Sequence, residues 1–355
     1  MRPVFVLLLV LAAHCNVARS DDKLPLVLNT WSFLDANVAA AETLLTGGSY
    51  IDAIETGCSV CEVEQCDGSV GYGGSPDELG NTTLDAMIMD GESHDVGSVG
   101  CLKDIRSAIS VARKIMETTK HTLLVGDDAT NFAIQMGFTR QSLETNHSLE
   151  LWAQWKSANC QPNYRVPGTI TPNPSISCGP YNPVPSVAFT DPRSDSRPPL
   201  SRYNHDTIGM VVVDAKGQIG CGTTTNGASH KIPGRVGDSP IVGAGCYVQK
   251  GVGGAAATGD GDIMMRFLPT YQVVQSMGAG MSPRDAAADA LNRIIKGCNC
   301  TFQGAIVAAT VDGTWGAATN GFNFSYTVYN PSLGTSTVMY VNNETENTYR
   351  ENKGI

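Results

Sequence analysis

Residues 208–213, IGMVVV, have apolar side chains on both faces of the β-strand that their pattern predicts. A strand that is apolar on both faces must lie inside a sheet covered on both sides. The turn AKG and a second predicted strand, QIGCGTTT, follow directly. Residues 304–320, GAIVAATVDGTWGAATN, repeat the pattern around an Asp-Gly turn, which is a strong hairpin signal. The simplest architecture is therefore β-sheets packed face to face, with helical layers outside.

Helical periodicity predicts the outer layers. Residues 35–57 indicate a helix, a break at Gly47-Gly48 and a second helix. Ser282 is a plausible N-cap, with Pro283 at the first helical position. The other predicted helices span 103–119, 128–137, 262–280 and 282–297, and further strands are predicted at 84–91 and 121–126.

The charge balance excludes some classes of function. The formal net charge is −10 and no run of Lys and Arg occurs, which argues against a nucleic-acid partner. The glycine-rich segments 243–261 lack both the full G-x-G-x-x-G spacing and the lysine of a phosphate loop. Asp260 and Asp262 fall short of a calcium loop. We expect no cofactor and no metal.

The N-terminal segment predicts entry into the secretory pathway. Residues 1–20, MRPVFVLLLVLAAHCNVARS, have one arginine, an apolar core and small residues near Ser20, as a signal peptide does. A membrane anchor is the alternative, but the apolar run is shorter than the roughly 20 residues that a span needs. We therefore expect a lumenal or secreted protein without a membrane association.

Cysteine usage fits an oxidising compartment. Cys61 and Cys66 could close a small loop, and Cys160 and Cys178 could bracket a proline-rich segment. A metal site at CSVCEVEQC is the alternative, but it lacks a fourth ligand at zinc-finger spacing, so a disulfide beside a buried Cys58 is favoured. The pairing of Cys221, Cys246, Cys298 and Cys300 stays open, although Cys298 and Cys300 are expected to be too close to pair with each other. N-glycosylation is possible at Asn81, Asn146, Asn299, Asn323 and Asn343.

A change in composition isolates Thr207. Residues 161–200 contain more than half of the prolines and few apolar side chains, which predicts a long surface loop. Order resumes at Thr207, directly before the buried strand. If the Asp206–Thr207 bond is cut, Thr207 carries a hydroxyl and a free α-amine on one residue. That amine, with an ordinary pKa of about 7.7–8.0, can accept the hydroxyl proton and activate the threonine as a nucleophile.

Threonine at the start of a strand is ordinary, so the surrounding motifs decide the interpretation. HDTIGMVVVDAKGQIGCGTTTNG, KIPGRVGDSPIVGAGCY and GGAAATGDGD resemble the glycosylasparaginases (aspartylglucosaminidases), which are N-terminal nucleophile hydrolases of the lysosome. The likeness extends through NTWSF, CEVEQCDGSVGYGGSPDELGNTTLDAMIMDG and CQPNY.

The resemblance implies an α+β fold, a four-layer αββα sandwich of the N-terminal nucleophile hydrolase type. It implies autoproteolysis between Asp206 and Thr207. The expected parts are a signal peptide 1–20, an α chain 21–206 with the loop at about 160–206, and a β chain 207–355, both chains in one folded domain. An (αβ)2 assembly and a lysosomal location, with secretion as the alternative, are likewise implied.

The implied activity is that of an N4-(β-N-acetylglucosaminyl)-L-asparaginase, which hydrolyses the amide between N-acetylglucosamine and an asparagine with free amino and carboxyl groups. Thr207 is the nucleophile, and Thr225 places a hydroxyl beside it. Thr258 and Gly259 form the oxyanion hole. Trp31 lines the mouth of the pocket, although a core tryptophan is also ordinary. The residues that match the substrate-binding segments are Arg235, Val236, Gly237, Asp238, Thr258, Gly259, Asp260 and Gly261.

Two departures and two rival functions remain. A charge at Asp260 could weaken anion stabilisation if it faces the oxyanion, and the cysteines after residue 220 do not reproduce the bridges of the vertebrate-type enzymes. The nearest rival is an isoaspartyl peptidase/L-asparaginase with the same nucleophile. The other is a secreted, non-catalytic glycan-binding relative that is never cut.

Overall fold

The computed structural model describes residues 23–184, 207–298 and 300–343. The proposed signal peptide, Asp206 and the sequon residue Asn299 lie outside these ranges. The helices are α1 Leu34–Leu45, α2 Tyr50–Glu64, α3 Ala108–Thr118, α4 Gly126–Gln135, α5 Asn146–Ser157, α6 Gly261–Phe267, α7 Pro269–Gly278 and α8 Pro283–Gly297, with a 3-10 turn at Cys66–Gly68. The strands are β1 Leu26–Thr30, β2 Leu84–Asp90, β3 Val96–Leu102, β4 Leu123–Val125, β5 Ile170–Thr171, β6 Asn182–Pro183, β7 Ile208–Val213, β8 Ile219–Thr225, β9 Cys246–Gln249, β10 Gly253–Gly259, β11 Gly304–Thr310, β12 Trp315–Asn320, β13 Phe324–Tyr329 and β14 Thr337–Val341.

The described strands form two main sheets. The larger has eight strands in the order β14-β13-β1-β7-β8-β2-β3-β4, and the smaller has four in the order β12-β11-β10-β9. All neighbours are antiparallel except β3 and β4. Strand β1, from the N-terminal half, lies between β7 and β13 from the C-terminal half. The mixed α+β class expected from the sequence is therefore observed.

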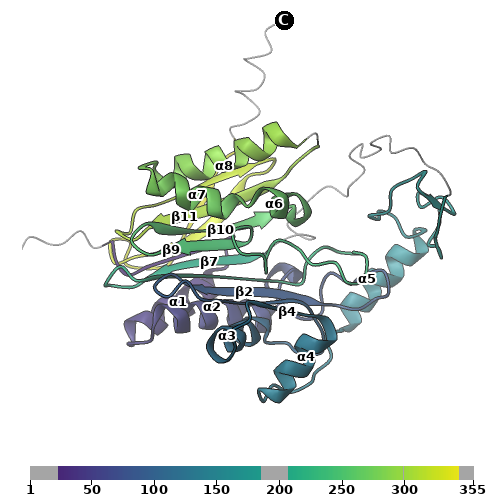
Figure 1. Cartoon of the computed structure of the whole chain (residues 1–355), viewed down its shortest axis with the longest axis horizontal. Helices are drawn as coiled ribbons and strands as arrows, with labels where there is room; N and C mark the ends of the chain where they lie inside the picture. Colours follow the sequence, from purple (N-terminus) through teal and green to yellow (C-terminus); the bar gives the residue numbers. More distant parts are fainter. Residues whose placement is uncertain (1–22, 185–206, 299, 344–355) are drawn as a thin grey trace, which may run out of the picture.

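The two sheets contact each other through β10, which packs on β7 and β8 (Figure 1). Helices α7 and α8 cover the outer face of the smaller sheet, while α1, α2 and α3 cover the outer face of the larger one (Figure 1). Every residue of β7 is buried, as its two apolar faces predict. The start of β7, where Thr207 lies, is therefore held in a rigid, dehydrated setting.

Two predicted helices differ from those observed. The segment 262–280 is not one helix: α6 ends and α7 begins around Leu268, which has a left-handed φ of 51°, and Pro269 starts α7 because its fixed φ suits a first helical position. The helix predicted from residue 103 begins only at Ala108, since Asp104 also has a positive φ. Ser282 caps α8 by accepting from the Asp285 N–H, as expected.

Strand β3 was not predicted, because its glycines hide the apolar pattern. A side chain at Gly97 would place its Cβ 1.9 Å from the Ala112 carbonyl oxygen, so α3 can lie on this strand only where a glycine leaves space. Helix α5 was also missed. Residues 170–183, inside the predicted loop, contain the short pair β5–β6.

The structure pairs Cys61 with Cys66, Cys160 with Cys178, and Cys221 with Cys246. The first two pairs are those considered from the sequence. The expectation that Cys298 and Cys300 are too close to pair is wrong, because their Cα atoms lie 5.2 Å apart, within the range of a disulfide. Cys58 and Cys101 are free and buried.

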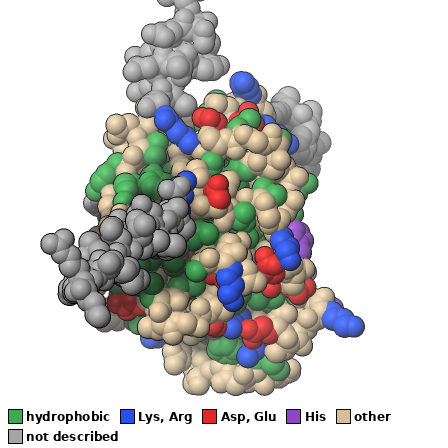
Figure 2. Space-filling view, turned by 90° about the vertical axis from the view of Figure 1, so that its left-hand side faces the viewer, with side chains coloured by type: hydrophobic (Ala, Val, Ile, Leu, Met, Phe, Trp, Pro, Cys, Tyr) green, Lys and Arg blue, Asp and Glu red, His purple; other side chains and the backbone are tan. Residues whose placement is uncertain are grey.

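On the face seen in Figure 2, Lys and Arg side chains alternate with Asp and Glu among hydrophobic and neutral ones. None of the helices in the described ranges combines the length and apolarity needed to cross a membrane. The same ranges contain no cluster of three or more His, Cys, Asp or Glu side chains arranged to bind a metal.

Candidate active site

Thr207 is 5% exposed and lies directly before the first residue of β7, where Thr30 binds its backbone. Thr30, the last residue of β1, donates its hydroxyl to the Thr207 carbonyl at 2.6 Å and accepts from the Gly209 N–H at 2.9 Å. β1 and β7 are hydrogen-bonded neighbours, so this side chain continues their ladder by one step. Thr30 therefore binds the backbone at the Thr207 carbonyl and again at the Gly209 N–H.

The Thr207 nitrogen contacts the predicted oxyanion residue. It donates to Thr258 Oγ1 at 3.2 Å, and the Trp31 indole N–H donates to the same oxygen at 3.1 Å. Both contacts use Oγ1 as the acceptor, so the hydroxyl hydrogen of Thr258 is left to donate to a third group. The structure thus brings together Trp31, which follows β1, Thr207, which precedes β7, and Thr258 of β10, although they lie far apart in sequence.

Trp31 belongs to the core and to the site at once. It is 8% exposed, stacks on Phe322 with ring centroids 5.5 Å apart, and meets Phe324 edge-on at 5.3 Å. Its backbone has a left-handed φ of 62°, an uncommon conformation for a bulky residue. The aromatic packing holds the ring, and the ring directs its N–H at Thr258.

The Ser239 hydroxyl lies next to the Thr207 hydroxyl, with the two oxygens 3.5 Å apart. Ser239 is fully buried, and its carbonyl accepts from the Thr223 hydroxyl at 2.6 Å. Thr225 accepts from the Gly227 N–H at 2.9 Å and donates to the Ser69 carbonyl at 3.3 Å. Its predicted role beside the nucleophile stays a prediction.

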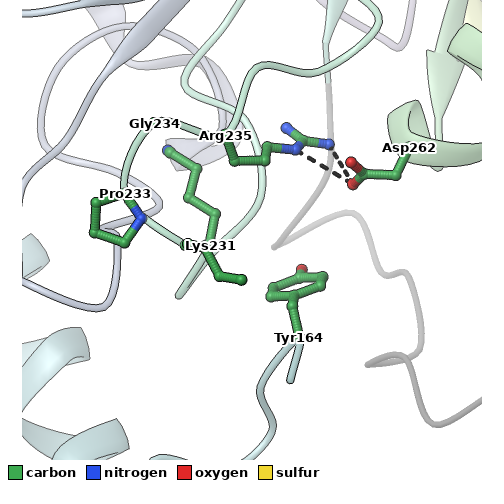
Figure 3. Close-up of a pocket in the computed structure, with 7 residues that line it drawn as sticks. Tyr164, Lys231, Pro233, Gly234, Arg235 and Asp262 are labelled. Carbon is green, nitrogen blue, oxygen red and sulfur yellow. Dashed lines mark hydrogen bonds and ion pairs between the residues drawn. The ribbon is translucent and has the colours of Figure 1, made fainter. Parts of the chain in front are cut away.

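Arg235 and Asp238 lie in one loop with Ser239. The Arg235 side chain is 14% exposed, and its Nε and Nη2 donate to Asp262 Oδ2 at 3.2 and 2.8 Å (Figure 3). Asp238 is buried, and its Oδ2 has no hydrogen-bond partner among the described residues. Burial raises the pKa of Asp238 to about 7, against the opposing influence of Arg235. A cation that enters here would satisfy this carboxylate.

Glycines allow the close packing of these charges. A Cβ at Gly261 would lie 2.5 Å from Asp238 Oδ1, and one at Gly237 would lie 2.8 Å from Arg235 Nη1. Gly259 has a φ of 134°, and a Cβ there would meet the backbone of the neighbouring strand β11. The predicted segments 235–238 and 258–261 are thus in mutual contact.

Asp260, whose charge raised a question in the sequence, is the residue immediately before α6. Its carboxylate accepts from the Ile263 N–H at 3.3 Å and caps α6. This is an ordinary use of aspartate at a helix N-terminus.

A cavity of about 450 Å³ adjoins Arg235. It is lined by Tyr164, Arg235, Asp262 and the segment 231–234 (Figure 3). Lys231 is buried and donates from Nζ to the carbonyls of Asn226 at 2.7 Å and Ser75 at 3.2 Å. Burial lowers the pKa of Lys231 to about 8.

A sequence profile of the asparaginase family matches residues 4–338. The chain belongs to the asparaginase family. It is 52% identical to the N4-(β-N-acetylglucosaminyl)-L-asparaginase of Rattus norvegicus over 328 residues, which cover 91% of this chain and 93% of the relative. It is 53% identical to the enzyme of the same name from Mus musculus over 315 residues, 89% of this chain and 90% of the relative. The resemblance to the glycosylasparaginases is confirmed.

Sequence reasoning missed several residues of this asparaginase-family site. Thr30 lies in the motif NTWSF next to Trp31, and Ser239 lies in KIPGRVGDSPIVGAGCY next to Asp238, but the sequence predicts no role for either. Asp262 lies in GDGD and had been considered only as a calcium ligand. The positions of Thr30 and Ser239 directly beside motif residues are the only signal in the sequence, and the contacts of their hydroxyls with Thr207 become visible only in the fold.

Proposed function

We propose that this protein is an N4-(β-N-acetylglucosaminyl)-L-asparaginase, an amidohydrolase that cleaves the link between N-acetylglucosamine and asparagine during glycoprotein degradation. The observation that carries the proposal is the contact of buried Thr207 with Thr258 and Ser239, next to the Arg235–Asp238 loop. The two mammalian relatives, at 52% and 53% identity, carry the name of this activity.

Activation begins with self-cleavage. The Thr207 hydroxyl attacks the carbonyl carbon of residue 206, the peptide C–N bond breaks, and an ester replaces it. The breaking of the C–N bond frees the α-amine of Thr207, which takes up the proton from the hydroxyl. Water then hydrolyses the ester, which frees the α-carboxylate of Asp206 and restores the Thr207 hydroxyl. The rigid position of Thr207 supports this step, because Thr30 holds its backbone while the hydroxyl stays near Ser239.

Hydrolysis uses the freed amine as the base. The amine takes the proton of the Thr207 hydroxyl, whose oxygen attacks the side-chain carbonyl of the glycosylated asparagine. The negative charge that develops on the carbonyl oxygen is stabilised by the Thr258 hydroxyl and the Gly259 N–H. The aminosugar leaves with a proton, and water opens the β-aspartyl ester to release aspartate.

Substrate binding depends on two charges. Arg235 binds the free α-carboxylate, because a guanidinium can donate two parallel hydrogen bonds to a carboxylate. Asp238 binds the α-amine, and its unpartnered Oδ2 supports this role. An asparagine inside a peptide lacks both charges, so the Arg235–Asp238 pair selects a free amino acid.

The wider organisation follows from the same proposal. The layers follow the order of helices, the four-stranded sheet, the eight-stranded sheet and helices again. This order supports the four-layer αββα sandwich. We further propose a signal peptide 1–20, an α chain 21–206 and a β chain 207–355 in one folded domain, an (αβ)2 assembly and a lysosomal location. Glycans at the five sequons and the oxyanion role of Gly259 belong to the same set of proposals.

Two measurements test the function. N-terminal sequencing of the mature protein is expected to give a fragment that begins at Thr207. Hydrolysis of N-acetylglucosaminyl-asparagine is expected to exceed that of β-aspartyl dipeptides. Preference for the dipeptide would favour an isoaspartyl peptidase, and an uncut, inactive mature chain would favour the non-catalytic relative.

A further inference from the structure

Asp85 is a buried carboxylate on the strand next to the site. It lies on β2, directly opposite Thr225 of β8, and is 3% exposed. The pairing of β2 with β3 shifts register between Leu84 and Ala86, so Asp85 occupies an irregularity in the ladder. Such irregularities redirect a side chain and leave backbone groups without ladder partners.

Both carboxylate oxygens of Asp85 accept backbone N–H groups. Oδ1 accepts from Cys101 of β3 at 2.8 Å, and Oδ2 accepts from Gly237 at 3.0 Å. Gly237 lies between Arg235 and Asp238. A single carboxylate therefore joins the substrate-binding loop to two strands of the large sheet.

A second contact joins the same loop to the same strand. A Cβ at Gly100 would lie 3.0 Å from Val236 Cγ2, so Val236 packs on the glycine next to Cys101. The loop is thus attached to β3 by packing at Val236 and to Asp85 by hydrogen bonding at Gly237. Arg235 and Asp238 flank these attachments, one on each side.

The charge of Asp85 also acts on the cations of the cavity. Burial lowers the pKa of Lys231, and the negative charge of Asp85 is the largest opposing influence. Asp85 acts in the same direction on Arg235, where it adds to Asp262. The carboxylate thus stabilises the charges of buried Lys231 and partly buried Arg235, which line the cavity.

We propose that Asp85 is a positioning residue for substrate binding. It holds the Arg235–Asp238 loop at the distance from Thr207 at which both ends of the amino acid are bound together. This inference rests on the proposed role of Arg235 and Asp238, and it concerns a residue that does not touch substrate.

Asp85→Asn tests the link in the full, processed enzyme. An amide has one oxygen and one NH2 group, so it cannot accept from both N–H groups, and it removes the charge. We expect KM for N-acetylglucosaminyl-asparagine to rise about tenfold while kcat stays within about threefold. Cleavage at Thr207 is expected to proceed, because Asp85 does not contact Thr207.

Competitive inhibition locates the defect. L-aspartate has both the α-carboxylate and the α-amine, succinate lacks the amine, and β-alanine lacks the α-carboxylate. In Asp85→Asn we expect the inhibition constant of L-aspartate to rise about as much as KM, and those of the two analogues to rise less, because each uses only one of the two groups. An equal change for all three inhibitors would overturn the proposal.

Two reference variants separate the possible failures. Asp90→Asn makes the same change on the same strand, where Asp90 accepts from the Tyr50 hydroxyl and the Glu92 N–H, and it is expected to leave KM unchanged. Arg235→Lys tests the clamp itself. If Arg235→Lys leaves KM unchanged, the proposed substrate binding fails; if only Asp85→Asn leaves it unchanged, the positioning role fails.

Asp85→Glu covers the case in which the asparagine variant does not fold. It keeps the charge and both acceptors but moves them by one methylene group, so a smaller rise in KM is expected at an almost constant kcat. In that case an unchanged KM, or a loss confined to kcat, would overturn the proposal.

Discussion

Thr258 Oγ1 accepts two N–H groups, one from the Trp31 indole and one from the Thr207 backbone. An oxygen whose lone pairs are both used as acceptors can offer only its hydrogen to a further partner. The two contacts thus leave the hydrogen of the Thr258 hydroxyl as the group that can be donated to substrate. Preorganised donors of this kind supply much of the stabilisation of a developing oxyanion.

Trp31→Phe is expected to lower kcat about tenfold, because the Thr258 hydroxyl loses one of the two contacts that orient it. Steady-state kinetics measure the effect, and Trp315→Phe on β12 is the matched control. In a Thr258→Ala background Trp31→Phe should have little further effect on kcat. If the two losses of kcat add up in the double variant, Trp31 does not act through Thr258.

Thr207→Ala is expected to give an uncut and inactive protein, because it removes the oxygen that attacks in both reactions. Thr207→Ser retains an oxygen and should still be cut. A denaturing gel and an activity assay check both variants. Two chains in the alanine variant would contradict self-cleavage by Thr207.

Asp260→Asn is expected to change kcat by less than about threefold, because asparagine caps a helix as well as aspartate does. Asp260→Ala should lower the free energy of unfolding by about 1 kcal/mol through loss of the α6 cap. Kinetics and thermal unfolding separate the two effects. A rate change above about tenfold in Asp260→Asn would indicate that the charge acts on the oxyanion.

Glu62 predicts a dependence of stability on pH. Its Oε1 accepts from the Ile109 N–H at 2.8 Å and the Thr224 hydroxyl at 2.7 Å, while Oε2 has no partner among the described residues. Burial raises the pKa of Glu62 from 4.5 to about 8. The folded protein therefore holds a proton between pH 4.5 and 8 that the unfolded chain has released.

The sign follows from this difference. The contribution of protonated Glu62 to the free energy of unfolding is complete below about pH 4.5 and is lost as the pH rises toward 8. Over this range the free energy of unfolding falls by up to about 1.4 kcal/mol per pH unit. Glu62→Gln mimics the protonated form, so its melting temperature should fall less than that of the wild type between pH 6.5 and 8. Glu64→Gln, on the exposed side of α2, is the control, and parallel curves for Glu62→Gln and wild type would contradict the assignment.

The sequence could predict those parts of the fold that depend on local pattern. The buried strand 208–213 and the helix caps at Ser282 and Pro283 are confirmed, because their signals lie within a few residues. Strand β3 could not be predicted, since the need for Gly97 comes from α3 above it. Thr30 and Ser239 were missed for a similar reason: their hydroxyls reach Thr207 only after distant strands pair.

The positions of the four described disulfides have a consequence for the proposed cut. Each joins two cysteines on the same side of residue 207, so no described covalent bond spans the proposed cut. Strand β1, which would belong to the proposed α chain, lies between β7 and β13, which would belong to the proposed β chain. If the chain is cut before Thr207 as proposed, the protein, once unfolded in dilute solution, can re-form only when two separate chains meet. Loss of the mature fold would therefore be concentration-dependent and in practice irreversible.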